Sequence, residues 1–105
     1  MSKYFNKKTD GFHSKKERDR YFELKLMQRA GMISGLERQV KFELIPAQPK
    51  VGLRSTNYYA DFVYWENGKF VVEDVKGYKK GQAYEMFMVK KKLMYQRYGH
   101  LIKET

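Results

Sequence analysis

The sequence predicts an α/β domain. Its order is a helix, a three-stranded meander, a second helix and a short last strand, with the helices packed on a mixed sheet. Three observations predict this order: helical spacing behind a capping signal at Ser14, alternating segments between residues 38 and 76, and a helical segment over 82–98. The 105 residues suffice for one domain with a modest core. We expect a flexible basic arm over residues 1–13 and a single domain over 14–105.

The first helix begins at the "SKKE" of residues 14–17. This pattern is a capping box, in which the Ser14 hydroxyl caps backbone amides and Glu17 reaches back. Gly31 is the expected stop. Tyr21, Leu24 and Gln28 follow Glu17 at helical spacing, and the set predicted to form the apolar side is Phe22, Leu26, Ala30 and Ile33.

Three strands follow the first helix. "RQVKFELIP" alternates with Val40, Phe42 and Leu44 on one face, and Pro46, Pro49 and Gly52 then mark a loop. "TNYYADFVYWE" and "KFVVEDVK" are the next two strands, and the Asn-Gly pair between them predicts a tight hairpin. After the second helix, which Gly99 ends, "HLIKE" is the candidate for the last strand.

The charge balance indicates an anionic partner. The chain carries 22 Lys and Arg residues against 12 Asp and Glu residues, a formal net charge of +10. Such a domain usually meets a polyanion, and nucleic acid leads that class, although a merely solvated basic surface remains open. Without cysteine there is no disulfide framework and no thiolate metal site, which is consistent with a reducing interior. No stretch has the length of a membrane span or of a signal-peptide core, so we expect no membrane partner.

Acidic residues interrupt the apolar strands. On the third strand Asp74 and Lys76 share one face, whereas Glu73 points to the other. On the second strand we expect Asp61 on the face of Tyr59, Val63 and Trp65, near Asp74 at the open end of the hairpin. Two carboxylates this close repel unless a cation lies between them, and buried unpaired acids are costly. A surface charge or a simple pair of Asp74 with Lys76 is the plainer alternative.

This arrangement suits hydrolysis of a phosphodiester. Asp61 and Asp74 provide the hard oxygen ligands that Mg²⁺ prefers, and Mn²⁺ is the expected substitute. A bound cation acidifies water and stabilises charge on phosphate oxygen. Lys76 is placed to position that water or to stabilise the phosphorus centre. No small-molecule cofactor is implied.

The pattern "YYADF" followed by "EDVK", behind a helix bearing a glutamate, resembles the PD-(D/E)XK nuclease superfamily. Nearly the whole chain also resembles a family of small phage-associated proteins, DUF1064, and archaeal Holliday-junction resolvases. The segments that carry this likeness are "GFHSKKERDRYFELKLMQRAGMISGLERQVKFELIP", "YYADFVYWENGKFVVEDVKG" and "KKKLMYQRYG". Ala60 stands before Asp61 where the superfamily motif has proline, a position that varies freely.

The resemblance implies a restriction-endonuclease-like core and a metal-dependent DNA endonuclease of phage or prophage recombination. It implies that Glu17, Asp61 and Asp74 hold the metal and that Lys76 is the catalytic lysine. It places the protein in the cytoplasm of a bacterial host, with branched DNA such as Holliday junctions as a candidate substrate. Resolving a junction requires two active sites, so a homodimer is expected. Helix capping alone also explains Glu17, and a polar strand end is the commoner explanation of Gln39.

Basic residues near the site are candidates for phosphate contacts. They are Lys15 and Lys16 in the first helical turn, Lys79 and Lys80 in the loop after the third strand, and Lys90 on the second helix. A lysine that reaches past methionines to solvent is the alternative for Lys90. Tyr4 and Phe5 of the arm are candidates for stacking on bases.

Two function classes remain open. One is the Mg²⁺-dependent nuclease, and the other is a non-catalytic nucleic-acid-binding recombination accessory protein on the same fold. The Asp61, Asp74 and Lys76 set favours the nuclease, because a mere binder gains nothing from acids that face phosphates.

Overall fold

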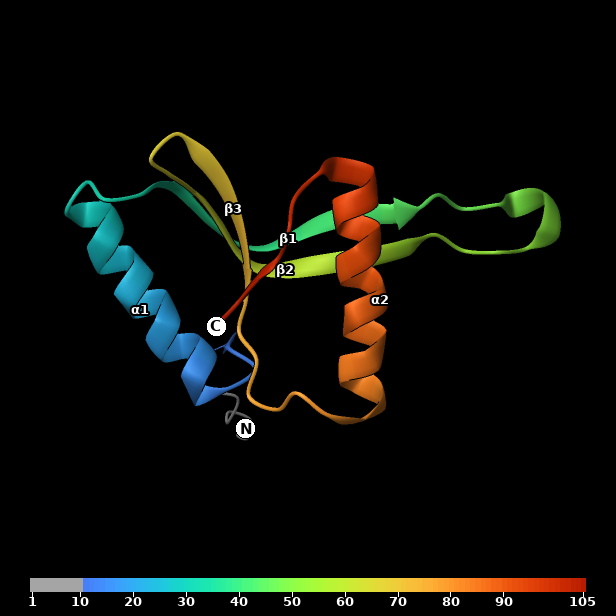
Figure 1. Cartoon of the computed structure of the whole chain (residues 1–105), viewed down its shortest axis with the longest axis horizontal. Coiled ribbons are helices and arrows are strands. Elements are labelled where there is room, and N and C mark those ends of the chain that lie inside the picture. The colour runs from blue at the N-terminus through green and yellow to red at the C-terminus, as the bar shows by residue number, and fades with distance from the viewer. Residues whose placement is uncertain (1–10) are drawn as a thin grey trace.

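The computed structural model describes residues 11–105, and it confirms the predicted order of elements (Figure 1). The elements are α1 (Lys15–Arg29), β1 (Ser34–Ile45), the short 3₁₀ helix η3 (Pro49–Val51), β2 (Thr56–Glu66), β3 (Lys69–Asp74), α2 (Gly81–Tyr98) and β4 (Lys103–Glu104). β1 therefore begins four residues earlier than expected, and β3 ends at Asp74 instead of Lys76. No helix of the described part is long and apolar enough to cross a membrane.

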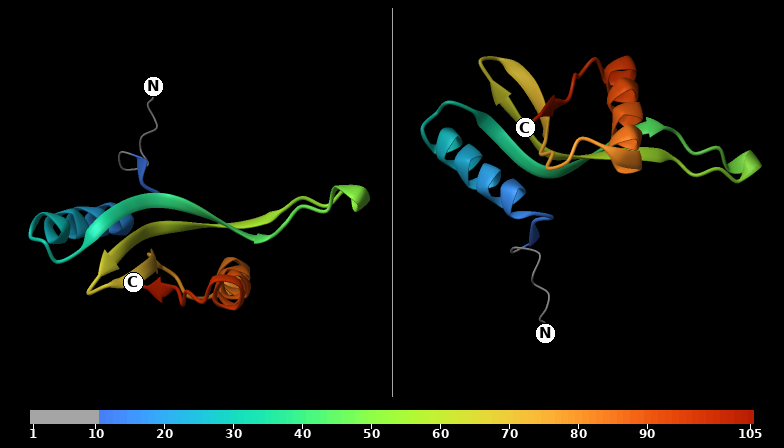
Figure 2. Two further views of the ribbon diagram at one scale, coloured as in Figure 1. Left: turned by 90° about the horizontal axis from the view of Figure 1, so that it is seen from above. Right: turned by 60° about the horizontal axis from the view of Figure 1, so that its bottom comes forward.

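The four strands form one mixed sheet in the order β1-β2-β3-β4. β1 pairs antiparallel with β2, β2 pairs antiparallel with β3, and β4 lies parallel to β3. Asn67 and Gly68 connect β2 to β3 with φ angles of 53° and 76°. Two left-handed residues are what a two-residue turn between twisted strands requires, so the predicted hairpin is confirmed. The far end of the β1–β2 hairpin projects away from both helices (Figures 1 and 2).

Two apolar clusters lie on opposite faces of the sheet, one under each helix. Leu24 of α1 packs in one cluster, and Phe87 and Met94 of α2 pack in the other. In Figure 1 the two helices stand on opposite sides of the central strands. The sheet is therefore a middle layer, and side chains from either helix can reach its edges.

β2 changes faces at Asp61. Ala60 belongs to the cluster under α2, and Phe62 belongs to the cluster under α1. In a regular strand, positions 60 and 62 would share a face. The expectation that Tyr59, Asp61, Val63 and Trp65 form one face is therefore wrong: Tyr59 is 53% exposed, whereas Val63 is buried with the α2 cluster.

The apolar side predicted for the first helix is also wrong. Phe22 and Leu26 are 55% and 63% exposed, whereas Glu17 and Leu24 are buried. A tertiary ion pair explains this rotation. Arg20 of α1 binds the buried carboxylate of Glu73 on β3, and this contact turns the Glu17 and Leu24 side of the helix toward the sheet.

The described end of the predicted arm is packed rather than loose. Phe12 is 4% exposed, its ring lies 5.3 Å from that of Tyr21, and the Arg38 guanidinium lies 3.8 Å from the Phe12 ring centroid. Aromatic and cation–π contacts thus fix residues 11–13 against the domain. Tyr4 and Phe5, predicted to stack on bases, lie outside the described residues.

Candidate functional site

The start of α1 places a buried carboxylate beside the sheet. Ser14 accepts a hydrogen bond on its Oγ from the backbone N–H of Glu17 (3.1 Å), as the capping box predicts. Glu17 Oε1, however, accepts from the backbone N–H of His13 at 3.0 Å, one residue earlier than the pattern indicates. The His13 ring lies 3.5 Å away through Nδ1. Capping therefore holds Glu17 in place but leaves its other oxygen, Oε2, free to face the strands.

Gln39 of β1 joins this carboxylate to a second one on β2. Its Nε2 donates to Glu17 Oε2 at 3.2 Å and to Asp61 Oδ1 at 3.1 Å. Gln39 has a φ of 49°, a left-handed conformation that costs a non-glycine residue free energy. The strained backbone lies where β2 changes faces, and it aims an amide N–H between two acids.

Asp61 is held by the end of β3 as well. Its Oδ2 accepts from the backbone N–H of Val75 at 2.8 Å. Burial raises the pKa of Asp61 to about 6, and the neighbouring Asp74 and Glu17 carboxylates add to this rise. The hydrogen bonds from Val75 and Gln39 only partly offset the burial and the negative charges. The site is therefore short of positive charge at Asp61.

Asp74 and Lys76 form the ion pair that their spacing on one face predicts. Lys76 Nζ lies 2.7 Å from Asp74 Oδ2 and 3.6 Å from the centroid of the Phe87 ring on α2. The Tyr58 hydroxyl donates to Asp74 Oδ1 at 2.9 Å, and burial, with the Asp74 charge, raises the pKa of Tyr58. Both the acid and the lysine are thus held on the α2 side of the sheet.

The site residues form two groups, Glu17 with Asp61 and Asp74 with Lys76, and a divalent cation fits the first group better. Among the described residues, His13, Glu17 and Asp61 offer ligand atoms that all lie within 4.8 Å of one another. Two carboxylates suit Mg²⁺, and the imidazole also suits a transition metal such as Mn²⁺. The three predicted metal ligands are therefore brought together only in part. Glu17 and Asp61 meet, whereas Asp74 is outside this group of ligand atoms and pairs with Lys76.

Glu73 lies on the face opposite Asp74, as predicted, and it has a structural position. It is fully buried on the face opposite Asp74, and Arg20 binds it through Nε at 2.6 Å and Nη2 at 3.0 Å. The hydroxyls of Tyr64 and Thr105 donate to the same carboxylate. These bonds hold the pKa of Glu73 below its ordinary value against the effect of burial. Glu73 therefore fixes α1, and with it Glu17, to the sheet.

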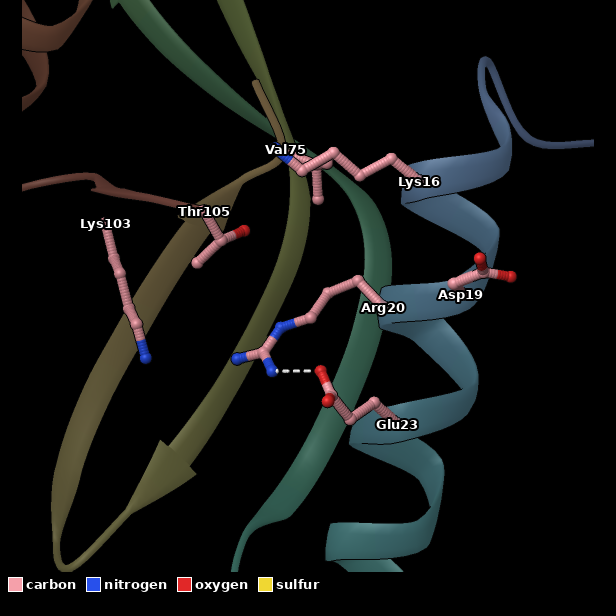
Figure 3. Close-up of a pocket in the computed structure, with 7 residues that line it drawn as sticks. All are labelled: Lys16, Asp19, Arg20, Glu23, Val75, Lys103 and Thr105. Carbon is pink, nitrogen blue, oxygen red and sulfur yellow. Dashed lines mark hydrogen bonds and ion pairs between the residues drawn. The ribbon is translucent and has the colours of Figure 1, made fainter. Parts of the chain in front are cut away.

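Figure 3 shows the groove outside this anchor. It is a surface cavity of about 530 Å³ lined by Lys16, Asp19, Arg20, Glu23, Val75, Lys103 and Thr105. In the groove the Arg20 side chain reaches from α1 toward the sheet, and its Nη1 donates to Glu23 at 2.6 Å. Since Arg20 is bound by two acids, the groove serves helix docking more than ligand binding.

The predicted basic residues lie at different distances from these groups. Lys16 Nζ donates to the backbone carbonyl of Lys76 at 2.6 Å, so it is beside the site. Lys90 lines a cavity together with Asp74 and Lys76. Lys79 lies 3.8 Å from Glu104, Lys80 precedes α2, and Lys15 is exposed in the first turn of α1.

Sequence reasoning undervalued Gln39 and missed His13 and Tyr58. The signal for His13 was its spacing of four residues before Glu17, and the signal for Tyr58 was its alternation with Ala60 on a buried strand face. Gln39 carried no local signal, because its partners come from α1 and β2.

The comparisons with known proteins point to a family and to no individual relative. No match to the chain was found among curated proteins, and none among solved structures. The family described as "Protein of unknown function (DUF1064)" matches residues 1–104. With nearly the whole chain matched, this protein belongs to the DUF1064 family.

Proposed function

We propose that this protein is a divalent-metal-dependent DNA endonuclease that hydrolyses phosphodiester bonds. The observation that carries the proposal is the meeting of Glu17 and Asp61 across Gln39, with the Asp74–Lys76 pair on the adjoining strand. Acids with one lysine at the end of a hairpin form the arrangement that the likeness to PD-(D/E)XK nucleases leads one to expect.

The electrostatics of the chain support catalysis over binding alone. The chain has a net charge of +10, yet three carboxylates gather at this one place. Acids that face DNA weaken phosphate binding unless a cation offsets them. A cluster that raises the pKa of its own Asp61 to about 6 is therefore costly for a mere DNA-binding protein. It is useful for a protein that recruits a metal ion to a phosphate.

Each side chain has a distinct part in the proposed reaction. Glu17 and Asp61 would hold the metal, with His13 available as a third ligand, and the metal would acidify a water and neutralise charge on the phosphate. Lys76 provides a fixed ammonium group for the charge that develops on phosphate oxygens. Gln39 orients the two carboxylates, and Tyr58 orients Asp74.

The wider setting follows from the same likeness. We propose phage or prophage recombination as the process, branched DNA such as Holliday junctions among the substrates, and a homodimer with two sites. The bacterial cytoplasm is the corresponding location. Lys16 and Lys90, which adjoin the Lys76 region, are the proposed phosphate contacts nearest the chemistry.

A cleavage panel tests the proposal. Wild type is incubated with four-way junctions, flaps and plain duplexes in Mg²⁺ or Mn²⁺, beside Asp61→Asn, Asp74→Asn and the control Asp19→Asn. Asp19 has a side chain 59% exposed on α1, away from the carboxylates. We expect metal-dependent cleavage by wild type and the control, and loss of about 10²-fold or more in the two site variants. Salt-sensitive binding by wild type without cleavage of any substrate would instead support the accessory protein.

A further inference from the structure

A second cavity, separate from the metal ligands, opens beside the Asp74–Lys76 pair. It measures about 300 Å³ and lies between β2, the end of β3 and α2. It is lined by Tyr58, Tyr59, Asp74, Lys76, Ala83, Met86, Phe87 and Lys90. The proposed metal ligands His13 and Glu17 come from the α1 side, so a phosphate at the site would have this cavity as its neighbour on the α2 side.

The walls of the cavity are aromatic and thioether surfaces. Tyr59 and Met86 are 53% and 56% exposed, so both side chains present apolar surface to solvent at this cavity. Behind them the rings of Tyr58 and Phe87 are buried and lie 6.3 Å apart. An exposed tyrosine face and an adaptable methionine offer a flat, sequence-tolerant surface to a planar ring.

The charged groups of the cavity are two lysines and one carboxylate. Lys76 is already paired with Asp74, whereas Lys90 is half-buried and in no ion pair with any residue of the described 11–105. An ammonium group that lines a cavity and has no ion-pair partner among residues 11–105 is available to an anionic ligand. Cations beside an aromatic wall match a nucleotide, which has a phosphate at one end and a planar base at the other.

We propose that this cavity binds one unpaired nucleotide next to the phosphate that is cut. Its base lies against Tyr59 and Met86, and its phosphate contacts Lys90. The proposal rests on the nuclease function and names its substrate class. A base in this cavity must leave the helical stack, which costs free energy in a paired duplex and little at an unpaired position. Flaps, gaps and frayed ends are therefore preferred over continuous duplex and over fully paired four-way junctions.

Binding without cleavage tests the cavity. A flap and a continuous duplex of equal length, the flap with 2-aminopurine at its first unpaired position, are titrated in EDTA with wild type, Tyr59→Ala and Lys90→Gln. Tyr95→Ala is the matched control, because Tyr95 is 59% exposed on α2 and lines a different cavity. Circular dichroism and thermal unfolding establish that each variant is folded.

We expect wild type to bind the flap more tightly than the duplex and to change the 2-aminopurine fluorescence. Tyr59→Ala should weaken flap binding by about 5- to 100-fold, the usual effect of losing one base–aromatic stack, and should leave duplex binding unchanged. Lys90→Gln should also weaken flap binding relative to wild type. Equal flap binding by wild type and Tyr59→Ala, or equal wild-type affinity for flap and duplex, would overturn the proposal. This binding assay does not depend on cleavage. If flap binding depended on Tyr59 but the cleavage panel showed no cutting of any DNA, the cavity would be supported and the nuclease function rejected.

Discussion

Replacing Asp61 by Asn should stabilise the metal-free protein, and the gain should grow with pH. The folded protein raises the pKa of Asp61 from 3.8 to about 6, mainly through burial and then through the Asp74 carboxylate. Between these two values the folded state holds a proton that the unfolded chain has released. Wild-type stability is therefore lost as pH rises through this window, and the loss is complete above pH 6.

The size of the effect follows from the same pKa values. The rise corresponds to about 3 kcal/mol at neutral pH, and about half of it is already present at pH 5. Asn loses part of the hydrogen bonding to Val75 and Gln39, which offsets about 1–2 kcal/mol at every pH. Asp61→Asn should therefore be more stable than wild type at pH 7 by about 1–2 kcal/mol. Its advantage should increase by about 1 kcal/mol between pH 5 and pH 7.

Urea unfolding in EDTA measures this, followed by the fluorescence of Trp65, the single tryptophan of the chain. Asp19→Asn, which changes an exposed carboxylate of α1, is the matched control. If the proposed metal site is correct, adding Mn²⁺ should then stabilise wild type more than Asp61→Asn, because the variant lacks one of the proposed ligands. If the unfolding free energies of wild type and Asp61→Asn ran parallel from pH 5 to pH 7, the raised pKa and the crowding of carboxylates would be refuted.

Three further changes separate chemistry, DNA contact and fold. Lys76→Ala should bind Mn²⁺ and DNA within several-fold of wild type yet cut about 10²-fold more slowly in single-turnover assays, and equal rates would remove Lys76 from the reaction. Replacing Lys79 and Lys80 together should flatten the slope of log affinity against log salt by up to ~2, whereas an unchanged slope would place the DNA elsewhere. Glu73→Gln should lower the free energy of unfolding by roughly 3 kcal/mol, because it leaves the Arg20 guanidinium without its buried partner. The exposed Glu23→Gln is the control for this last change in urea unfolding, and equal stability of the two variants would contradict the anchoring role of Glu73.

The elements that sequence predicted well are those with local signals. β2 has the predicted bounds, and the Asn67–Gly68 turn fixes its pairing with β3. Asp74 and Lys76 pair as their spacing of two residues predicts, although β3 ends at Asp74. The tertiary contacts were beyond such reasoning. No local sequence pattern indicates that Arg20 binds Glu73 and so sets which side of α1 faces the sheet.

Gln39 shows the limit for the candidate site. Its place opposite the Asp61 region depends on the pairing of β1 with β2. These two strands are separated in sequence by a loop that contains the 3₁₀ helix η3. Burial alternates along β1 through this point, yet β2 changes faces there and Gln39 adopts a positive φ. Periodicity therefore placed the acids on the correct strands but could not place the amide between them.

The change of face at Asp61 has a consequence for how the site forms during folding. Glu17 belongs to α1 on one side of the sheet, and Lys76 contacts Phe87 of α2 on the other side. Neither cluster alone builds the whole constellation, so a chain with only one helix docked holds half of it. Local opening of α1 or of α2 would therefore separate the groups of the candidate site before the sheet unfolds. In a nascent chain, the complete set of groups assembles only after α2, which follows α1 and the three strands of the meander in the chain, has docked.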